Sequence, residues 1–292
     1  MNKTIGYGKA HSKIILMGEH SVVYGYPALA LPLKDIEVTC RIFPAAKPLA
    51  FDFYDPLSTA VYAALEHLGC LAEPIHYDIM SQVPQKRGMG SSAAVSIAAV
   101  RAVFSYFGQP LSNELLEILV NKAEIIAHTN PSGLDAKTCL SDKAIKFIRN
   151  VGFDTIDIQL NAYLVIADTG IQGHTREAVN KVAQFEEENL PHLAKLGCLT
   201  EAVEQAIKTN DCLAIGRFMT QAHESLKAIG VSVAKADQLV EAALEAGALG
   251  AKMTGGGLGG CMIALAERIT DAQQISKKLK EEGAVNTWIQ IL

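Results

Sequence analysis

The spacing of hydrophobic and polar positions along the chain predicts both strands and helices, as in an α+β protein. Near the N-terminus, short apolar runs at 13–17, 22–31 and 35–43 favour strands, and prolines such as Pro32 mark their ends. Residues 57–69 instead repeat apolar side chains every three or four positions, which is typical of a helix packed on a core.

The same patterns continue along the chain and divide it into two parts. In the first part we further expect a strand at 75–80, helices at 91–107 and from about 112, a loop at 129–135, and strands at 144–148 and 155–160. In the second part we expect strands at 162–167, 251–253, 261–265 and 287–291, helices filling 174–246, and a helix at 271–282. This order fits a split β-α-β layered domain of the ferredoxin-like kind. The change of pattern near 150–161 predicts two domains, 1–154 and 155–292.

Composition and charge narrow the class of protein. The chain has 292 residues, of which 49% are hydrophobic and 20% charged, and this suits a globular protein with a large core. The net charge of −5 and the scattered Lys and Arg residues argue against a nucleic-acid-binding protein. No apolar run reaches the ~18 residues of a membrane span. The six cysteines show no C-x-x-C spacing, so we expect free thiols in a reducing cytoplasm.

The stretch from Arg87 to Ala94 is the most informative one. Gly88 and Gly90 are followed by two serines and then by an apolar run, which predicts a tight loop leading into a buried helix. Unpaired N–H groups and the positive end of the helix dipole make such a start attractive to anions. A phosphate site and an ordinary helix start are equally consistent with this stretch. A dinucleotide-binding fingerprint is not consistent with it, because no acidic residue stands at a strand end about 20 residues later, where the chain has Gly108-Gln109.

A few polar residues in apolar surroundings are candidates for chemistry. Asp135 ends a loop, Glu124 lies on an otherwise apolar helix face, and Lys13 opens an apolar strand. Each has an ordinary interpretation: a turn aspartate, a solvated carboxylate, and a lysine that reaches water from a strand end. Each also has a functional one: a group facing substrate, a magnesium ligand, and a buried cation. Glu19 and His20 favour a surface polar pair.

Three motifs, in their order and approximate spacing, resemble those of the GHMP kinase family. They are Lys13-Ile-Ile-Leu-Met-Gly-Glu-His-Ser-Val-Val-Tyr-Gly25, Gly88-Met-Gly-Ser-Ser-Ala-Ala94 and Lys252-Met-Thr-Gly-Gly-Gly-Leu-Gly-Gly260. The first motif, with Asn130-Pro-Ser-Gly-Leu-Asp135, is similar to that of the mevalonate kinases within this family. Galactokinases would be expected to carry a threonine–aspartate pair where this chain has Ser21-Val22.

The resemblance implies a two-domain α+β fold, the GHMP kinase fold. Its N-terminal domain contains a left-handed β-α-β unit and binds ATP, its C-terminal domain is ferredoxin-like, and the active site lies between them. The resemblance places the triphosphate of ATP on Pro84, Gln85, Lys86, Arg87, Gly88, Met89, Gly90, Ser91, Ser92, Ala93 and Ala94.

The resemblance also implies roles for single residues. Ser92 and Glu124 match the family's ligands for Mg²⁺. Asp135 matches the carboxylate that faces the substrate hydroxyl, and Lys13 matches the lysine beside it. The residues expected near the substrate are Glu19, His20, Thr175 and Gly256.

The function implied is ATP-dependent phosphorylation of the 5-hydroxyl of mevalonate, in the mevalonate route to isoprenoids. Mevalonate and ATP would be the partners, with neither nucleic acid nor membrane, in a protein expected to form a homodimer. Two alternatives stay open. One is another small-molecule kinase of the family, acting on phosphomevalonate or homoserine. The other is a ligand sensor without catalysis, whose signature would be the loss of Asp135, Lys13 or the Ser92–Glu124 pair, all of which are present.

Overall fold

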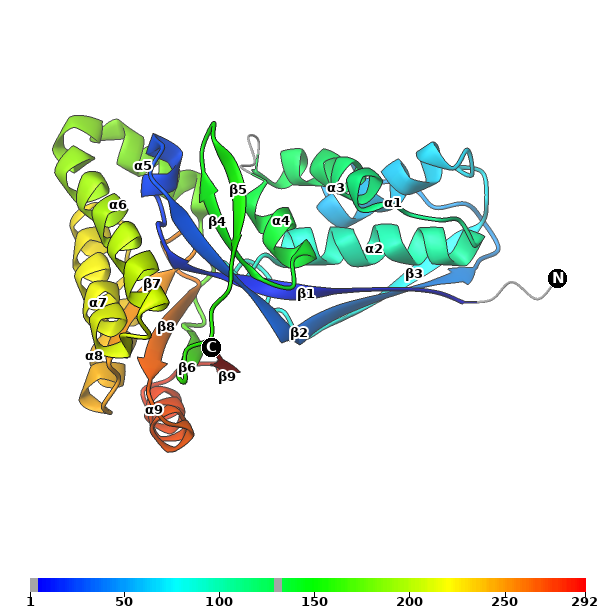
Figure 1. Cartoon of the computed structure of the whole chain (residues 1–292). Helices are drawn as coiled ribbons and strands as arrows, with labels where there is room; N and C mark the ends of the chain where they lie inside the picture. Colours follow the sequence, from blue (N-terminus) through cyan, green and yellow to red (C-terminus); the bar gives the residue numbers. More distant parts are fainter. Residues whose placement is uncertain (1–4, 129–132) are drawn as a thin grey trace. The chain divides into compact units, whose positions relative to one another are not determined.

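The computed structural model describes residues 5–128 and 133–292 (Figure 1). In chain order the elements are β1 (Gly6–Met17), the 3-10 helix η1 (Ser21–Tyr24), β2 (Ala28–Pro44), α1 (Pro56–His67), β3 (Ile75–Ser81), α2 (Ser91–Phe107), α3 (Asn113–His128), α4 (Leu134–Leu140), β4 (Ala144–Ile148), β5 (Gly152–Ile156), β6 (Tyr163–Asp168), α5 (Thr175–Gln184), α6 (Glu186–Lys208), α7 (Cys212–Ala228), α8 (Ala234–Glu245), β7 (Gly250–Thr254), β8 (Cys261–Ala266), α9 (Ile269–Glu281) and β9 (Asn286–Ile291). Within these ranges no helix is long and apolar enough to cross a membrane.

Two compact units make up the structure, and neither is a continuous stretch of chain. The first contains the described residues up to Lys13 together with Pro32–Gln85 and Gly90–Asp142. The second contains Ile14–Leu31, Lys86–Met89 and Lys143–Leu292. The boundary between 154 and 155 that the sequence predicts stays a prediction.

Two strand predictions near the N-terminus are wrong in detail. Ser21–Tyr24 form a 3-10 helix, so the second strand begins only at Ala28. That strand then runs through Pro32, which we expected to end it. Pro32 lies between the residues of β2 that pair with β4 and those that pair with β3, so its missing N–H falls outside both of these ladders.

A third correction concerns the hairpin of β4 and β5. The second strand of the hairpin begins at Gly152, earlier than the 155 that the sequence predicts. Asn150 adopts a φ of 65°, and the N–H of Val151 donates to Ile148 O at 3.0 Å, so the chain reverses at once. Asparagine tolerates this left-handed conformation better than most residues, and the register Ile148–Gly152 follows from the tight turn.

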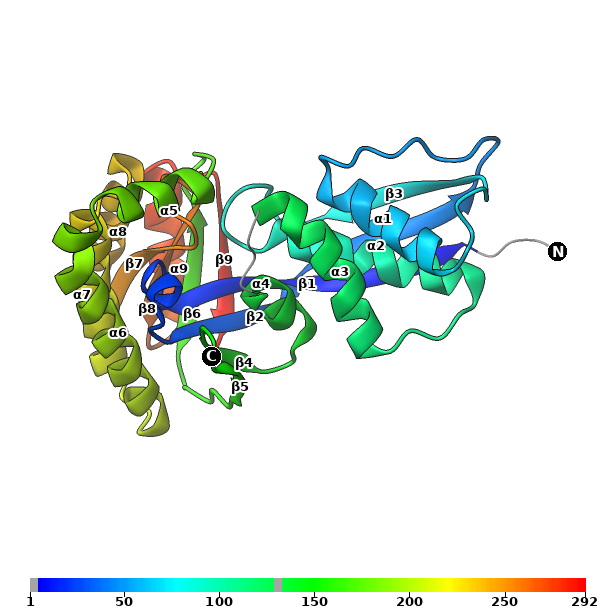
Figure 2. The ribbon, with the colours of Figure 1, turned by 90° about the horizontal axis from the view of Figure 1, so that it is seen from above.

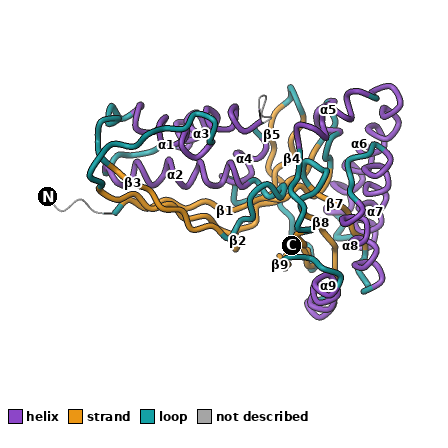
Figure 3. The backbone as a smooth tube through the Cα atoms, turned by 180° about the vertical axis from the view of Figure 1, so that it is seen from behind, coloured by secondary structure: helices purple, strands orange, loops and turns teal. Residues whose placement is uncertain are grey.

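In the first unit, α1, α2 and α3 pack against one another, with the β2–β3 pair beside them (Figure 3). The central helix, α2, is buried along most of its length because its own side chains are small or apolar on almost every side. Glycines in the left-handed conformation stand at both ends of α2, Gly90 with φ 69° and Gly108 with φ 62°. They allow abrupt entry and exit of the chain where a side chain would be strained.

The second unit is built on a four-stranded antiparallel sheet in the order β7-β8-β6-β9 (Figure 2). Four helices, α5 to α8, connect β6 to β7, and α9 connects β8 to β9. This arrangement is the ferredoxin-like one that the sequence predicts. All residues of β8 are buried, and so are all but the first of β6. Burial on both faces explains why these strands read as continuous apolar runs instead of alternating ones.

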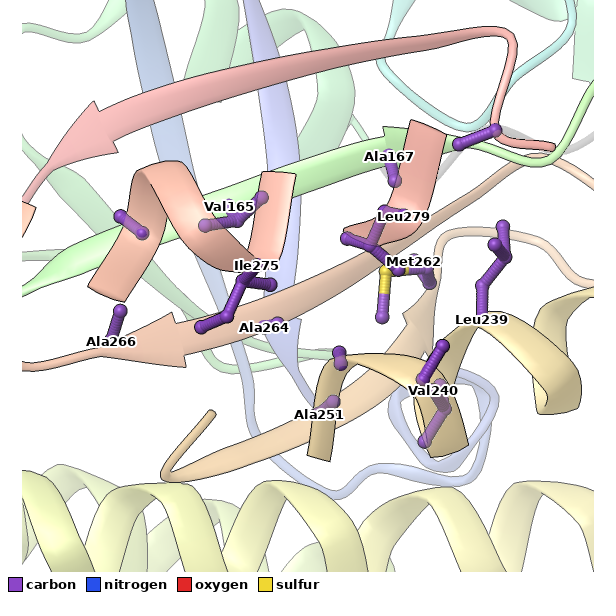
Figure 4. Close-up of a cluster of buried hydrophobic side chains, with 14 residues drawn as sticks. Val165, Ala167, Leu239, Val240, Ala251, Met262, Ala264, Ala266, Ile275 and Leu279 are labelled. Carbon is purple, nitrogen blue, oxygen red and sulfur yellow. The ribbon is translucent and has the colours of Figure 1, made fainter. Parts of the chain in front are cut away.

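One face of this sheet packs against α8 and α9 (Figure 4). Alanines on both the strands and the helices lie among the larger side chains of this cluster, so the two layers approach closely. The labelled members are Val165, Ala167, Leu239, Val240, Ala251, Met262, Ala264, Ala266, Ile275 and Leu279.

The outer edge of the sheet, β7, is covered by α7. Edge strands expose unpaired N–H groups, and two of these are capped by side chains one helical turn apart. The N–H of Ala251 donates to Thr220 Oγ1 at 3.2 Å, and that of Met253 donates to His223 Nδ1 at 3.3 Å. His223 Nε2 lies 3.2 Å from Asp237 Oδ1. Burial lowers the pKa of His223 to about 4, because Asp237 offsets only part of the desolvation of the charged ring.

The buried ring of His223 predicts a pH dependence of stability. Its pKa is about 4 in the folded chain against 6.5 for an ordinary histidine, so between these values the unfolded chain binds the additional proton. The free energy of unfolding should therefore decrease as pH falls from 6.5 to 4, with His223 contributing up to roughly 1.4 kcal/mol per pH unit. Denaturant titrations of the wild type and His223→Asn, whose amide oxygen can take the place of Nδ1, should give a shallower slope for the variant. His76→Asn, at an exposed histidine, is the control that should keep the wild-type slope. Equal slopes for the wild type and His223→Asn would contradict this account.

Candidate active site

Lys13 is buried in the first unit beside Asp135. Its side chain is 2% exposed, and Nζ lies 2.8 Å from Asp135 Oδ1. The sequence predicts a strand that opens at Lys13, but β1 begins at Gly6 and Lys13 lies well inside it. The interpretation as a lysine reaching water from a strand end is therefore wrong. A buried ammonium needs a compensating partner, and Asp135 supplies it.

Asp135 lies in the first turn of α4 and not in a loop as the sequence predicts. Gly133, with φ 77°, stands at the N-terminal end of this helix and lets the chain turn directly into it. The rest of the expected motif, Asn130, Pro131 and Ser132, lies outside the described residues. Asp135 is 28% exposed, so the carboxylate touches both the buried lysine and the surface.

Gly90 leaves the space through which the Lys13 side chain reaches Asp135. A Cβ added at Gly90 would stand 2.8 Å from Lys13 Cγ and 3.3 Å from Cys139 Sγ. Contacts of that length do not occur between carbon atoms without displacement of one group. The second glycine of the Gly88–Gly90 loop is therefore required by the packing of Lys13 as well as by its φ of 69°.

Ser92 and Glu124, which the family resemblance implies as magnesium ligands, are hydrogen-bonded to each other. Ser92 Oγ donates to Glu124 Oε1 at 2.9 Å, and Glu124 is 1% exposed, which excludes the solvated interpretation. Burial, together with the nearby Asp135 carboxylate, raises the pKa of Glu124 to about 7, although Ser92 and Lys13 oppose the shift. The two pairs, Lys13–Asp135 and Ser92–Glu124, thus influence each other electrostatically.

The donor set at this place fits a hard divalent cation. A hydroxyl and a carboxylate are oxygen ligands of the kind that Mg²⁺ prefers, and Mg²⁺ usually keeps its other positions for water and phosphate. The ranges 5–128 and 133–292 hold no group of three or more His, Cys, Asp or Glu side chains that could bind a metal alone. A site of two protein oxygens completed by a nucleotide is consistent with both observations.

In the second unit, Arg87 is already ion-paired. Its Nε lies 2.8 Å from Asp168 Oδ1, and its Nη2 donates to Gly170 O at 3.0 Å. The backbone next to it is held too, because Lys86 O accepts from the N–H of Gly173 at 2.8 Å. The sequence did not single out Asp168. The only signal for it was its place at the end of an apolar strand, in Asp168-Thr-Gly170. Arg87 therefore fixes the loop, whereas Lys86 is exposed.

Two glycine loops contact each other within the second unit. A Cβ at Gly255 would stand 2.9 Å from Gly88 Cα, and one at Gly256 would stand 2.0 Å from Thr175 Oγ1. Gly88 and Gly255 both have positive φ, at 76° and 81°. Backbones can approach this closely only where side chains are absent. The second and third sequence motifs are brought together here, with Thr175 beside them.

Glu19 and His20 are buried, so the prediction of a surface polar pair is wrong. Glu19 is 1% and His20 6% exposed. Glu19 forms an ion pair with Lys252, another residue that the sequence analysis did not single out. Burial lowers the pKa of His20 to about 4, with the Gly256 backbone opposing this and Lys252 adding to it. The residues expected near the substrate, Glu19, His20, Thr175 and Gly256, therefore belong to one neighbourhood of the second unit.

Comparisons with known proteins identify the family. The model "GHMP kinases N terminal domain" matches residues 57–143, and "GHMP kinases C terminal" matches 199–285. A mevalonate kinase of Thermococcus sibiricus is 33% identical, over 94% of this chain and 96% of the relative.

Solved structures agree with this assignment. A mevalonate kinase from methicillin-resistant Staphylococcus aureus is 33% identical, with a TM-score of 0.79 over 99% of both chains. A mevalonate kinase of L. major in complex with R-mevalonate is 27% identical, with a TM-score of 0.87 over 99% of this chain and 96% of that one. The fold and the family resemblance predicted from the motifs are confirmed. The chain belongs to the GHMP kinase family, and the relatives described here are mevalonate kinases.

Proposed function

We propose that this chain transfers the γ-phosphoryl group of ATP to the 5-hydroxyl of mevalonate, giving 5-phosphomevalonate. The observation that carries the proposal is the ion pair of the buried Lys13 with Asp135, electrostatically coupled to the Ser92–Glu124 pair. Phosphoryl transfer requires a group that orients the nucleophile, a cation and a metal-holding oxygen set, and these two pairs contain all three. Because the relatives are mevalonate kinases, mevalonate is the substrate that we propose.

In this mechanism each residue has a defined task. The Asp135 carboxylate accepts a hydrogen bond from the 5-hydroxyl and takes its proton as that oxygen bonds to the γ-phosphorus. The bond from the γ-phosphorus to the bridging oxygen of the β-phosphate breaks in the same step, and ADP leaves. Lys13 balances the charge of Asp135 and screens the negative charge that develops on the transferred group. Ser92 and Glu124 would hold Mg²⁺, which when bound with ATP neutralises the β- and γ-phosphates.

The start of α2 provides the anion site in this proposal. Gly88 and Gly90 carry no side chain, so a triphosphate can come close to the backbone, and the helix start favours negative charge. Three of the loop residues expected at the nucleotide, Met89, Ala93 and Ala94, are fully buried. Their contribution would come from the backbone alone, while the serines supply hydroxyl groups.

Turnover of ATP with a panel of alcohols, with and without Mg²⁺, tests the proposed function. Mevalonate should be phosphorylated only when Mg²⁺ is present. Activity with phosphomevalonate or homoserine instead of mevalonate would favour another kinase of the family. No turnover with any of the three would favour a ligand sensor. The homodimer and the cytoplasmic location stay predictions, the first of which light scattering on the purified protein can test.

Substitution of Asp135 tests its role in the chemical step. Asp135→Asn keeps the size of the side chain but removes the proton acceptor, so kcat should decrease by ~10²–10⁴. The Kd for ATP should change little. Asp157→Asn is a matched control, because Asp157 lies 2.8 Å from Lys143 in a pair that is exposed. Near-normal kcat in Asp135→Asn would remove the carboxylate from the mechanism.

Substitution of Glu124 tests the magnesium site. Glu124→Gln should raise the Mg²⁺ concentration needed for half-maximal activity, since one charged oxygen ligand is lost. The control is Glu117→Gln on the same helix, whose carboxylate is 36% exposed and pairs with Lys137. Titration of activity with Mg²⁺ at fixed ATP measures both variants. An unchanged Mg²⁺ requirement in Glu124→Gln would exclude Glu124 as a ligand.

A further inference from the structure

The turn after β1 holds a strained residue. His20 adopts φ 61° and ψ −45°, a conformation that non-glycine residues rarely take. Such strain costs on the order of 1–3 kcal/mol and persists only where the surroundings impose it. Local hydrogen bonds are present, from the N–H of Ser21 to Glu19 O at 2.7 Å and from Ser21 Oγ to Gly18 O at 3.3 Å. They bracket the turn without contacting the ring of His20.

Strand β7, which is distant in sequence, is bonded to this turn. Lys252 Nζ donates to Glu19 Oε1, and both side chains are fully buried. Two residues further on, Thr254 Oγ1 donates to Ile15 O at 2.7 Å. The end of β1 and the turn that follows it are thus bonded to β7 at two points.

The direction of the Lys252 side chain is set by its strand. Successive side chains of a strand point to opposite faces, and Ala251 belongs to the core cluster under α8 and α9. Pairing with Ile263 of β8, and the capping of the neighbouring N–H groups by α7, fix the register of β7. The side chain of Lys252 therefore extends from the opposite face of the sheet. Burial lowers its pKa, and Glu19 opposes that shift as the carboxylate that stabilises the ammonium.

Two buried atoms at this turn lack a partner among the described residues. They are Glu19 Oε2 and His20 Nε2. A buried polar atom without a hydrogen bond is costly, and a functional site is one of the few places where such atoms are found. His20 Nε2 also lies 3.4 Å from the point that a Cβ on Gly257 would occupy, so it faces the glycine loop.

We propose that Lys252 is a positioning residue for substrate binding: through its ion pair with Glu19 it holds His20 against the Gly255–Gly260 loop. The inference rests on the proposed function, because the bound substrate is taken to be mevalonate. Lys252 itself does not touch the substrate, and its effect passes through Glu19.

A double-mutant cycle tests this path. Lys252→Met and Glu19→Gln each remove one charge at nearly constant volume, and the double variant removes both. At a temperature well below every melting point, Lys252→Met should raise KM for mevalonate about tenfold or more, with a smaller change in KM for ATP. In the Glu19→Gln background the same substitution should change KM for mevalonate less than about twofold, because the path is already broken.

The melting temperatures provide a second readout that needs no substrate. Each single variant leaves an unpaired buried charge, so the double variant should melt at a higher temperature than either of them. The matched control is Lys146→Met with Glu204→Gln, a less deeply buried pair of the same unit, which should leave KM for mevalonate unchanged.

Four results would count against these proposals. A folded Lys252→Met with unchanged KM for mevalonate, or effects of the two substitutions that multiply, would overturn the positioning role. A double variant that melts below both single variants would overturn the coupling of the pair. A wild-type protein that does not phosphorylate mevalonate would refute the proposed function, and the melting temperatures would still test the coupling.

Discussion

The buried ammonium groups of Lys13 and Lys252 each require an opposite charge beside them, and much of the local structure follows from meeting that requirement. Lys13 is buried inside β1 and depends on Asp135. For the pair to form, α4 must begin immediately after Gly133, and Gly90 must leave room for the lysine side chain. The positions of Gly90, of the start of α4 and of Lys13 therefore depend on one another.

The second unit meets the same requirement with different residues. Lys252 and Glu19 are buried completely as a pair, and Arg87 is largely buried beside Asp168. In both cases an ion pair anchors a loop that a family motif marks. Ion pairs of this kind are poor sources of stability, since desolvation offsets their attraction, but they determine strongly which groups lie together.

Glycines allow the loops of the second unit to approach one another closely. Gly88 and Gly255 approach until a side chain on either would collide with the other loop, and Gly256 leaves room for Thr175. Close backbone approach and paired buried charges together fix loops that contain few apolar residues. The apolar cluster under α8 and α9 provides the rigid base to which β7 belongs, and α7 protects its edge.

The sequence by itself determined most elements of regular structure, but not helix α4 or the exact bounds of β2 and β5. It also determined the ferredoxin-like order of the second part, the glycine loops and the family. These depend on local periodicity, on turn residues and on short motifs, all of which can be recognised in the sequence. It also indicated Ser92 with Glu124 and Lys13 with Asp135, through the family resemblance.

Only the tertiary structure decided burial and pairing. Glu19 and His20 were expected to form a surface pair because neighbouring polar residues usually do, and the lysine that pairs with Glu19 is 233 positions away. Asp168 and His223 were not found for the same reason: their partners, Arg87 and the N–H of Met253, are distant in sequence. Asp135 was expected in a loop because its glycine and proline suggested a turn, whereas Gly133 begins a helix. Local sequence sets conformational preference, but the environment of a charge is made by segments that meet only when the chain has folded.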